Sequence, residues 1–147
     1  MMNKRIFWLL IFCLTISTLL VASPEEAKSE PIYVFANPNV GDSVLTPSDI
    51  QNIYLGKKDK WRDNQGINFT ALSDGECYEA FIRQFVERTP FQFQNYWKKQ
   101  IFTGKGQPPR GFDSPDELVD YVSRTSGAIG FSCTPPDTGR VKILTIE

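Results

Sequence analysis

The sequence predicts an α/β domain in which a mixed sheet is flanked by about four helices. Two observations support this fold class. Short apolar runs rich in β-branched and aromatic residues recur along the chain, and the segments between them carry helix-start signals and helical apolar spacing. Strands that alternate with helices in this way are typical of layered α/β domains.

Four apolar runs are predicted to be strands. They are residues 32–36, 67–72, 127–133 and 141–146. The first, Ile-Tyr-Val-Phe-Ala, has no polar residue, and an unbroken apolar run of this length is typical of a strand buried on both faces.

The predicted helices begin with a shared signature. Thr46-Pro47, Thr89-Pro90 and Ser114-Pro115 each place a hydroxyl at the N-cap and a proline at the first helical position, with an acid or amide three residues after the cap. Ser73 and Glu76 repeat the hydroxyl-to-acid spacing without the proline. The helix predicted after them has an amphipathic stripe made of Tyr78, Phe81, Ile82, Phe85 and Val86.

Residues 94–109 are predicted to begin as a helix with a broad aromatic face and to end as a loop. Gly104 and Gly106 permit positive φ, and Pro108-Pro109 favours an extended exit. One interpretation is a core helix with a tight exit loop. The other adds a binding surface lined by Thr103, Gly104 and Lys105.

The turn Ser73-Asp74-Gly75-Glu76 is a second candidate for ligand binding. It follows a predicted strand and opens a helix, and ligands of α/β domains often bind at this position because free N–H groups and the helix dipole attract anions. Asp74 and Glu76 are equally suited to stabilising the helix dipole as ordinary first-turn residues. Both interpretations remain open at this stage.

The first residues have the pattern of a secretory signal peptide. Lys4 and Arg5 precede an apolar run that ends near small residues, and this run is shorter than the roughly 20 residues of a membrane-spanning helix. We expect a signal peptide at 1–23, a charged linker at 24–31 and one domain at 32–147. The protein is then periplasmic or secreted, with no stable membrane span after cleavage; an uncleaved membrane anchor is the alternative.

Composition excludes several functions. The chain has no histidine, so it holds no Ser-His-Asp or Cys-His machinery and no histidine-ligated metal. Without Lys4 and Arg5 the net charge is near −3, which argues against a nucleic-acid partner but leaves a small anion or another small solute open. No nucleophile–base pair is legible, so we expect neither an enzyme nor a cofactor.

Cys77 and Cys133 are the cysteines outside the predicted signal peptide. Two thiols alone cannot complete a four-coordinate zinc site. In an oxidising compartment a disulfide between them is the simpler expectation, provided that their Cα atoms lie within about 7 Å.

Several motifs together resemble the substrate-binding proteins of bacterial phosphate-uptake transporters. They are Leu45 to Lys57 with Trp61, Ser73-Asp74-Gly75, Tyr96 to Pro109 and Gly127 to Phe131. The resemblance, closest to short single-domain relatives, runs from about residue 32 to the end. It implies one lobe of the periplasmic-binding-protein fold and a non-enzymatic role in binding a solute for a transporter or receptor of the envelope.

The chain departs from this family at the ligand loop, where relatives have a sequence similar to Arg-x-Asp-Gly-Ser-Gly-Thr. Only Asp74 and Gly75 match; Leu72 stands at the arginine and Glu76 at the serine. Replacing a bidentate anion donor and adding a carboxylate reverses the local electrostatics. The alternative function is therefore a structural or partner-binding envelope protein that kept the fold and lost the small ligand.

Overall fold

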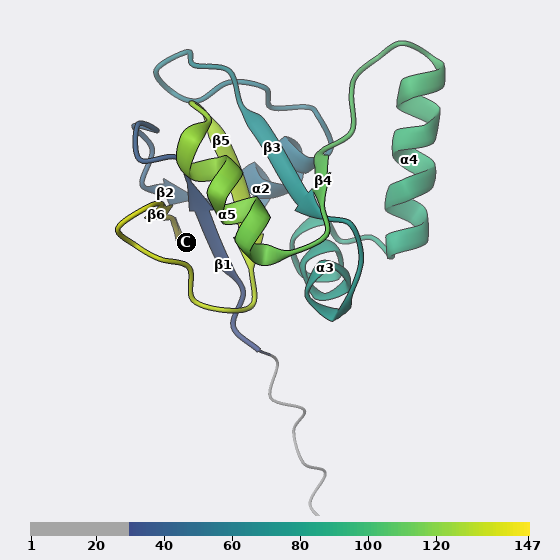
Figure 1. Cartoon of the computed structure of the whole chain (residues 1–147). Coiled ribbons are helices and arrows are strands. Elements are labelled where there is room, and N and C mark those ends of the chain that lie inside the picture. Colours follow the sequence, from purple (N-terminus) through teal and green to yellow (C-terminus); the bar gives the residue numbers. More distant parts are fainter. Residues whose placement is uncertain (1–29) are drawn as a thin grey trace, which may run out of the picture.

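The computed structural model describes residues 30–147 (Figure 1). The predicted signal peptide, and the predicted linker apart from its last two residues, lie outside this range. Within it, no helix combines the length and apolar character needed to cross a bilayer.

A five-stranded mixed sheet forms the middle layer of this part of the chain, in the order β4-β3-β5-β1-β6. Its strands are β1 (Tyr33–Ala36), β3 (Asn68–Leu72), β4 (Arg110–Phe112), β5 (Ala128–Ser132) and β6 (Lys142–Ile143). Strand β3 runs parallel to β4 and β5, whereas β1 runs antiparallel to β5 and β6. The short β2 (Val44–Leu45) pairs with β7 (Thr145–Ile146) in a second sheet. The predicted mixed α/β architecture is confirmed.

Helices cover both faces of the sheet. They are α2 (Pro47–Tyr54), α3 (Glu76–Phe81) with its π-helical continuation η1 (Ile82–Val86), α4 (Pro90–Phe102) and α5 (Pro115–Arg124). In Figure 1, α5 lies in front of the sheet and α2 behind it, while α4 stands at the periphery beyond β4. The sheet thus has a helical layer on each side, and α4 is the helix with the largest share of exposed residues.

Three of the four predicted helix starts are correct. The hydroxyls of Thr46, Thr89 and Ser114 each accept a hydrogen bond from the backbone N–H three residues later. The predicted cap at Ser73 is wrong, because α3 has Gly75 at its N-cap and no side-chain cap. The Ser73 N–H instead donates to the Phe112 carbonyl at 2.8 Å, which keeps Ser73 in line with β3.

Two strand predictions also differ from the structure. The run 141–146 divides at Leu144, whose N–H donates to the Val34 carbonyl at 2.9 Å, so β6 and β7 join different sheets. Strands β2 and β4 are absent from the prediction, because Val44-Leu45 and Arg110-Gly111-Phe112 are too short to show a strand pattern.

The core centres on Tyr54, the last residue of α2, which is fully buried. Its ring makes edge contacts with Phe69, Phe81 and Phe131 at centroid distances of 5.8, 4.7 and 6.1 Å. Its hydroxyl donates to the Thr70 carbonyl at 2.8 Å. Burial raises the pKa of this hydroxyl, so it stays a neutral donor at every physiological pH.

The opposite face of β5 accepts α5 only because a glycine stands at the contact. A Cβ on Gly130 would overlap the Leu118 side chain and would come within 2.8 Å of the Thr70 hydroxyl oxygen. The backbone of β5 at Gly130 and helix α5 therefore lie closer together than a residue with a Cβ atom would permit.

The disulfide Cys77–Cys133 joins the first turn of α3 to the chain just after β5. The two Cα atoms lie 5.7 Å apart, inside the range that a bridge requires, and the closed loop spans 56 residues. The bridge therefore fixes the start of α3 to the end of the central strand.

We predict that Gly130→Ala lowers the free energy of unfolding by about 1–3 kcal/mol, because the added methyl overpacks the α5 contact. Urea denaturation followed by circular dichroism measures the change. Gly66→Ala is the matched control, since a Cβ there meets nothing within 4 Å. Equal midpoints for the two variants would contradict the prediction.

Replacing both Cys77 and Cys133 with serine is expected to lower the free energy of unfolding by about 4 kcal/mol, because the unfolded chain regains the entropy of a 56-residue loop. Urea midpoints of the oxidised protein and the double variant give the difference. Dithiothreitol should lower the urea midpoint of the oxidised protein and leave that of the double variant unchanged. A shift in both midpoints would show that the loss of stability does not come from the disulfide.

Candidate functional site

The first predicted ligand segment, Ser73 to Glu76, lies at the carboxyl end of β3 and leads into α3. All four residues are exposed, and Gly75 has φ +93°. Strand β4 passes close by, since a Cβ on Gly111 would lie 3.2 Å from the Ser73 hydroxyl oxygen. Asp74 and Glu76 bring two carboxylates to this turn, so it does not attract an anion by charge.

The second predicted segment, Thr103 to Lys105, caps the far end of α4. The Thr103 hydroxyl donates to the Lys99 carbonyl at 2.9 Å, and Gly104 has φ +67°. All three residues are exposed. Helix α4 has 13 residues and is therefore about 20 Å long. Its first residues lie near η1, and its last residues, which carry this segment, point away from β3 and α3 (Figure 1). The structure therefore separates this segment from Ser73 to Glu76.

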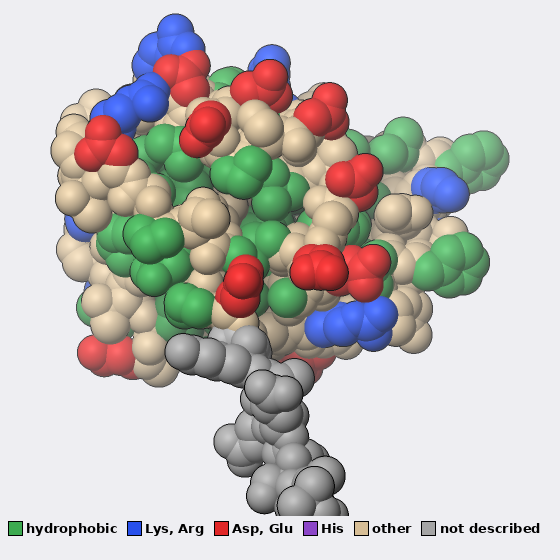
Figure 2. All heavy atoms as spheres, turned by 60° about the horizontal axis from the view of Figure 1, so that its bottom comes forward, with side chains coloured by type: hydrophobic (Ala, Val, Ile, Leu, Met, Phe, Trp, Pro, Cys, Tyr) green, Lys and Arg blue, Asp and Glu red, His purple; other side chains and the backbone are tan. Residues whose placement is uncertain are grey.

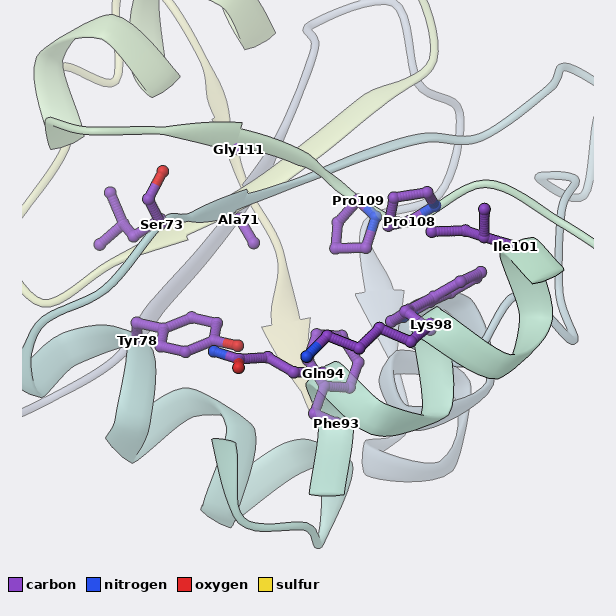
Figure 3. Close-up of a pocket in the computed structure, with 12 residues that line it drawn as sticks. Ala71, Ser73, Tyr78, Phe93, Gln94, Lys98, Ile101, Pro108, Pro109 and Gly111 are labelled. Carbon is purple, nitrogen blue, oxygen red and sulfur yellow. The ribbon is translucent and has the colours of Figure 1, made fainter. Parts of the chain in front are cut away.

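Between the two segments lies a concave site, which we call the α4 groove. It encloses about 300 Å³ between α4 on one side and β3, β4 and the loop before β4 on the other. Its lining residues are Ala71, Leu72, Ser73, Tyr78, Phe93, Gln94, Trp97, Lys98, Ile101, Pro108, Pro109 and Gly111. Figure 3 shows the α4 side chains facing Pro108, Pro109 and the strands across the open space.

The walls of the α4 groove are mainly aromatic and aliphatic, and its polar groups are few. Gln94 and Lys98 lie one helical turn apart on the same side of α4, and their side chains extend toward Tyr78 (Figure 3). Burial raises the pKa of the Tyr78 hydroxyl, and its hydrogen bond with Gln94 acts in the opposite direction. The phenol therefore remains neutral at neutral pH.

Lys98 is the cation of this site. Its side chain is exposed, and none of the ion pairs among residues 30–147 involves it. Arg110, which the sequence places near the same loop, is directed elsewhere: its guanidinium lies over the rings of Phe112 and Tyr121, at 5.7 and 4.7 Å from their centroids. One unpaired ammonium thus stands at the edge of an apolar groove.

Sequence reasoning missed the groove although it identified parts of its walls. Of the predicted site residues, the structure brings only Ser73 into it. A usable signal was the pair Gln94 and Lys98, spaced i, i+4 beside the buried Phe93 and Trp97, followed by the double proline.

The motifs that carry the family resemblance have structural roles around this site. The Tyr96 hydroxyl donates to the Leu55 carbonyl at 2.7 Å, and the Trp97 indole N–H donates to the Tyr54 carbonyl at 3.1 Å. Gly56 has φ +68°, and a Cβ there would lie 2.8 Å from the Trp97 ring. The Ile-Tyr-Leu-Gly and Tyr-Trp segments therefore dock α4 onto the end of α2.

No group of three or more acidic, cysteine or histidine residues suited to a metal ion occurs within residues 30–147. The α4 groove itself combines aromatic walls with neutral hydrogen-bonding groups and one ammonium.

No protein-family model matches the chain, and no curated protein matches its sequence. Solved structures do. The chain is similar to an ABC-type phosphate transport receptor from Vibrio cholerae, with 14% identity, a TM-score of 0.52, and coverage of 78% of this chain and 45% of that one. It is also similar to PstS from Borrelia burgdorferi, with 15% identity, a TM-score of 0.58, and coverage of 79% and 47%.

A third similar structure is a phosphate ABC transporter substrate-binding protein with bound phosphate from Clostridium perfringens, with 17% identity, a TM-score of 0.62, and coverage of 78% and 44%. The chain spans less than half the length of each of these proteins. At the level of fold, the resemblance seen in the sequence is confirmed: this chain has the fold of part of a phosphate-transporter substrate-binding protein.

Proposed function

We propose that this chain is an exported, non-enzymatic binding module that holds a small amphipathic anion in the α4 groove and presents it to a transporter or receptor of the envelope. The observation that carries the proposal is the combination of apolar walls with the unpaired ammonium of Lys98. A groove of about 300 Å³ matches the lower end of the range for small-molecule sites, roughly 300–1,000 Å³.

The walls select the apolar part of the solute. Tyr78, Phe93 and Trp97 are buried in the core and keep their shape without a ligand, so the groove is largely preformed. Lys98 and the amide of Gln94 offer donors to a carboxylate or sulfonate at one end of the groove. A solute with a flat or aliphatic body and one anionic end satisfies both requirements.

Free phosphate does not fit the same description. Its many oxygens require several charge-assisted donors, and the Leu72 side chain offers none. Asp74 and Glu76 bring two carboxylates to the turn that begins at Ser73, so this end of the groove does not attract a phosphate by charge. Lys105 stands at the far end of α4 and offsets none of this.

Export belongs to the proposal as well. The basic-apolar-small pattern of residues 1–23 supports a cleaved signal peptide, with 24–31 as the linker to the domain at 32–147. A disulfide between Cys77 and Cys133 forms and persists in an oxidising compartment, which supports a location in the periplasm or outside the cell.

A second candidate function is binding of a protein partner, with no small solute. It is favoured by one observation: Phe91 and Phe102 of α4 are 70% and 93% exposed. Large aromatic side chains left in solvent are typical of contact surfaces.

We predict that the protein lacking residues 1–23 does not bind inorganic phosphate at micromolar concentration, because that affinity requires about −8 kcal/mol from a site with too few donors. Titration calorimetry at neutral pH is the measurement. Saturable micromolar binding by the monomer would contradict it.

We predict that 3-phenylpropionate binds in the α4 groove and quenches or shifts the fluorescence of Trp97. Lys98→Gln should weaken this binding about fivefold, which corresponds to about 1 kcal/mol for an exposed ion pair. Lys99→Gln is the matched control, since Lys99 is a neighbouring lysine outside the groove lining.

The neutral alcohol 3-phenylpropanol separates the charge effect from packing, because Lys98→Gln should leave its binding unchanged. The titrations are made in dilute solution with both variants and the unaltered chain. An equal loss of carboxylate binding in the Lys98 and Lys99 variants, or no saturable binding by the unaltered chain, would overturn the groove as the solute site.

A further inference from the structure

A second concave site lies at the end of the sheet where β3 and β4 begin. The two strands are parallel, and their pairing starts at Thr70 and Arg110. The first residues of β3, Asn68 and Phe69, therefore extend beyond the start of β4. A cavity of about 290 Å³ occupies this corner, and we call it the Arg110 pocket. Its walls include Tyr121 of α5, the helix that lies in front of the sheet in Figure 1.

The Arg110 pocket is separate from the α4 groove. The segment that leads into β4 stands between the two, and Pro108 borders both. Of the two cavities, Gln107 and Arg110 line only the pocket. Pro109 and Gly111 line only the groove. A ligand of the pocket is therefore independent of the solute proposed for the groove.

The guanidinium of Arg110 is held by its flat face. It stacks over the rings of Tyr121 and Phe112, at 4.7 and 5.7 Å from their centroids, and the centroids of these rings lie 5.1 Å apart. Stacking uses the face of a guanidinium and leaves the N–H donors in its plane available. None of the ion pairs among residues 30–147 involves Arg110. The fork that binds carboxylates is thus positioned, with no carboxylate partner in the described chain.

The nearby carboxylates do not neutralise Arg110. Asp120 forms ion pairs with Arg124 and Arg140, so its charge is compensated by two other arginines. Glu117 lines a neighbouring cavity, and Arg110 does not border that cavity. The pocket therefore keeps the positive charge of Arg110.

The two ends of strand β3 differ in charge. At its carboxyl end Asp74 and Glu76 follow the strand. Figure 2, which brings the lower side of Figure 1 forward, shows Asp and Glu side chains spread over the face at that end. The Arg110 pocket lies at the other end, where β3 and β4 begin. Charge therefore favours an anion at the beginning of the strands.

The other polar groups of the pocket are neutral amides. The Asn68 side chain donates to the Ser126 carbonyl at 2.8 Å, which holds it at the start of β3. Gln107 is exposed on the loop before β4. An amide is both donor and acceptor, so it suits a hydroxyl better than a second anionic oxygen. Phe69 and Tyr121 are half-buried and add flat apolar surface to the walls.

We propose that the Arg110 pocket binds a carboxylate that also carries hydroxyl groups, of the class of the sugar acids. The guanidinium donates two parallel hydrogen bonds to the carboxylate, and the amides of Asn68 and Gln107 bind hydroxyls. Phosphate gains less here, because a single guanidinium and neutral amides supply few charge-assisted donors. An open site with one ion pair binds weakly, with a dissociation constant of about 1 mM.

The test is an NMR titration of the isotope-labelled protein lacking residues 1–23 with D-glucuronate. We expect saturable shifts at residues 67–69 and 107–110 and at the Arg110 side chain. D-glucuronamide keeps the hydroxyls without the negative charge and should bind about tenfold more weakly. Acetate keeps the carboxylate without the hydroxyls and should bind about fivefold more weakly.

Two variants test the roles of the side chains. Arg110→Lys keeps the charge but loses the planar fork, so it should weaken glucuronate binding about fivefold. Arg88→Lys is the matched control, because Arg88 also stacks on an aromatic ring, 5.2 Å from the centroid of Tyr96, and does not line the pocket. Gln107→Ala should weaken glucuronate about threefold and leave acetate binding unchanged. Circular dichroism shows whether each variant is folded.

Three outcomes would overturn the proposal. The first is no saturable shift at glucuronate concentrations up to about 50 times the expected dissociation constant. The second is equal glucuronate affinity in the Arg110→Lys and Arg88→Lys variants. The third is binding of acetate or inorganic phosphate as tight as that of glucuronate, which would show an unselective anion site. The comparison of ligands uses the unaltered chain, so it decides the matter even where a variant fails to fold.

Discussion

The packing of helices on the sheet depends on one buried hydrogen bond, which the hydroxyl of Tyr54 makes inside an aromatic core. This hydroxyl donates to the Thr70 carbonyl and so sets the height of α2 over β3. The same residue accepts the indole N–H of Trp97 at its backbone carbonyl, which positions α4. Its ring meets Phe81 of α3 and Phe131 of β5. One residue thus relates three helices to the sheet, and a buried tyrosine is retained because its polar atom has a fixed partner.

The α4 groove is a consequence of that arrangement. The side chains of Tyr96 and Trp97 donate their hydrogen bonds to backbone carbonyls at the end of α2. Helix α4 is therefore attached on its α2 side, and a gap remains between α4 and β4. The gap is lined by whatever remains on that side of the helix, which is mainly apolar. The solved structures of similar fold include one with bound phosphate, but this chain spans less than half the length of that protein. Fold likeness therefore does not transfer the ligand, and the chemistry of the groove has to be judged from its own residues.

The sequence predicted the helices and strands of this fold better than it predicted how they pair and pack. Capping hydroxyls and prolines at Thr46, Thr89 and Ser114 are local signals, and the helices they mark are present. Strand β4 and the break at Leu144 depend on partners distant in sequence, so no local pattern reports them. The candidate site was predicted from residues near glycines, and those segments proved to lie at opposite ends of α4. Only tertiary packing brings Ser73 beside Gln94 and Lys98, which is why neighbouring positions in the sequence could not reveal the groove.

The position of β1 in the sheet has a consequence for how the chain is made. Strand β1 lies between β5 and β6, which are synthesised almost 100 residues later, and the chain near β5 also supplies the second half of the disulfide. Within residues 30–147, β1 is the first strand to be made, and both of its neighbours in the sheet come near the end of this range. Pairing strands that are this distant in sequence carries a large loop-closure entropy, so we expect this sheet to form more slowly than one built from neighbouring strands. During synthesis, the hydrogen bonds of β1 are therefore among the last of the sheet to form.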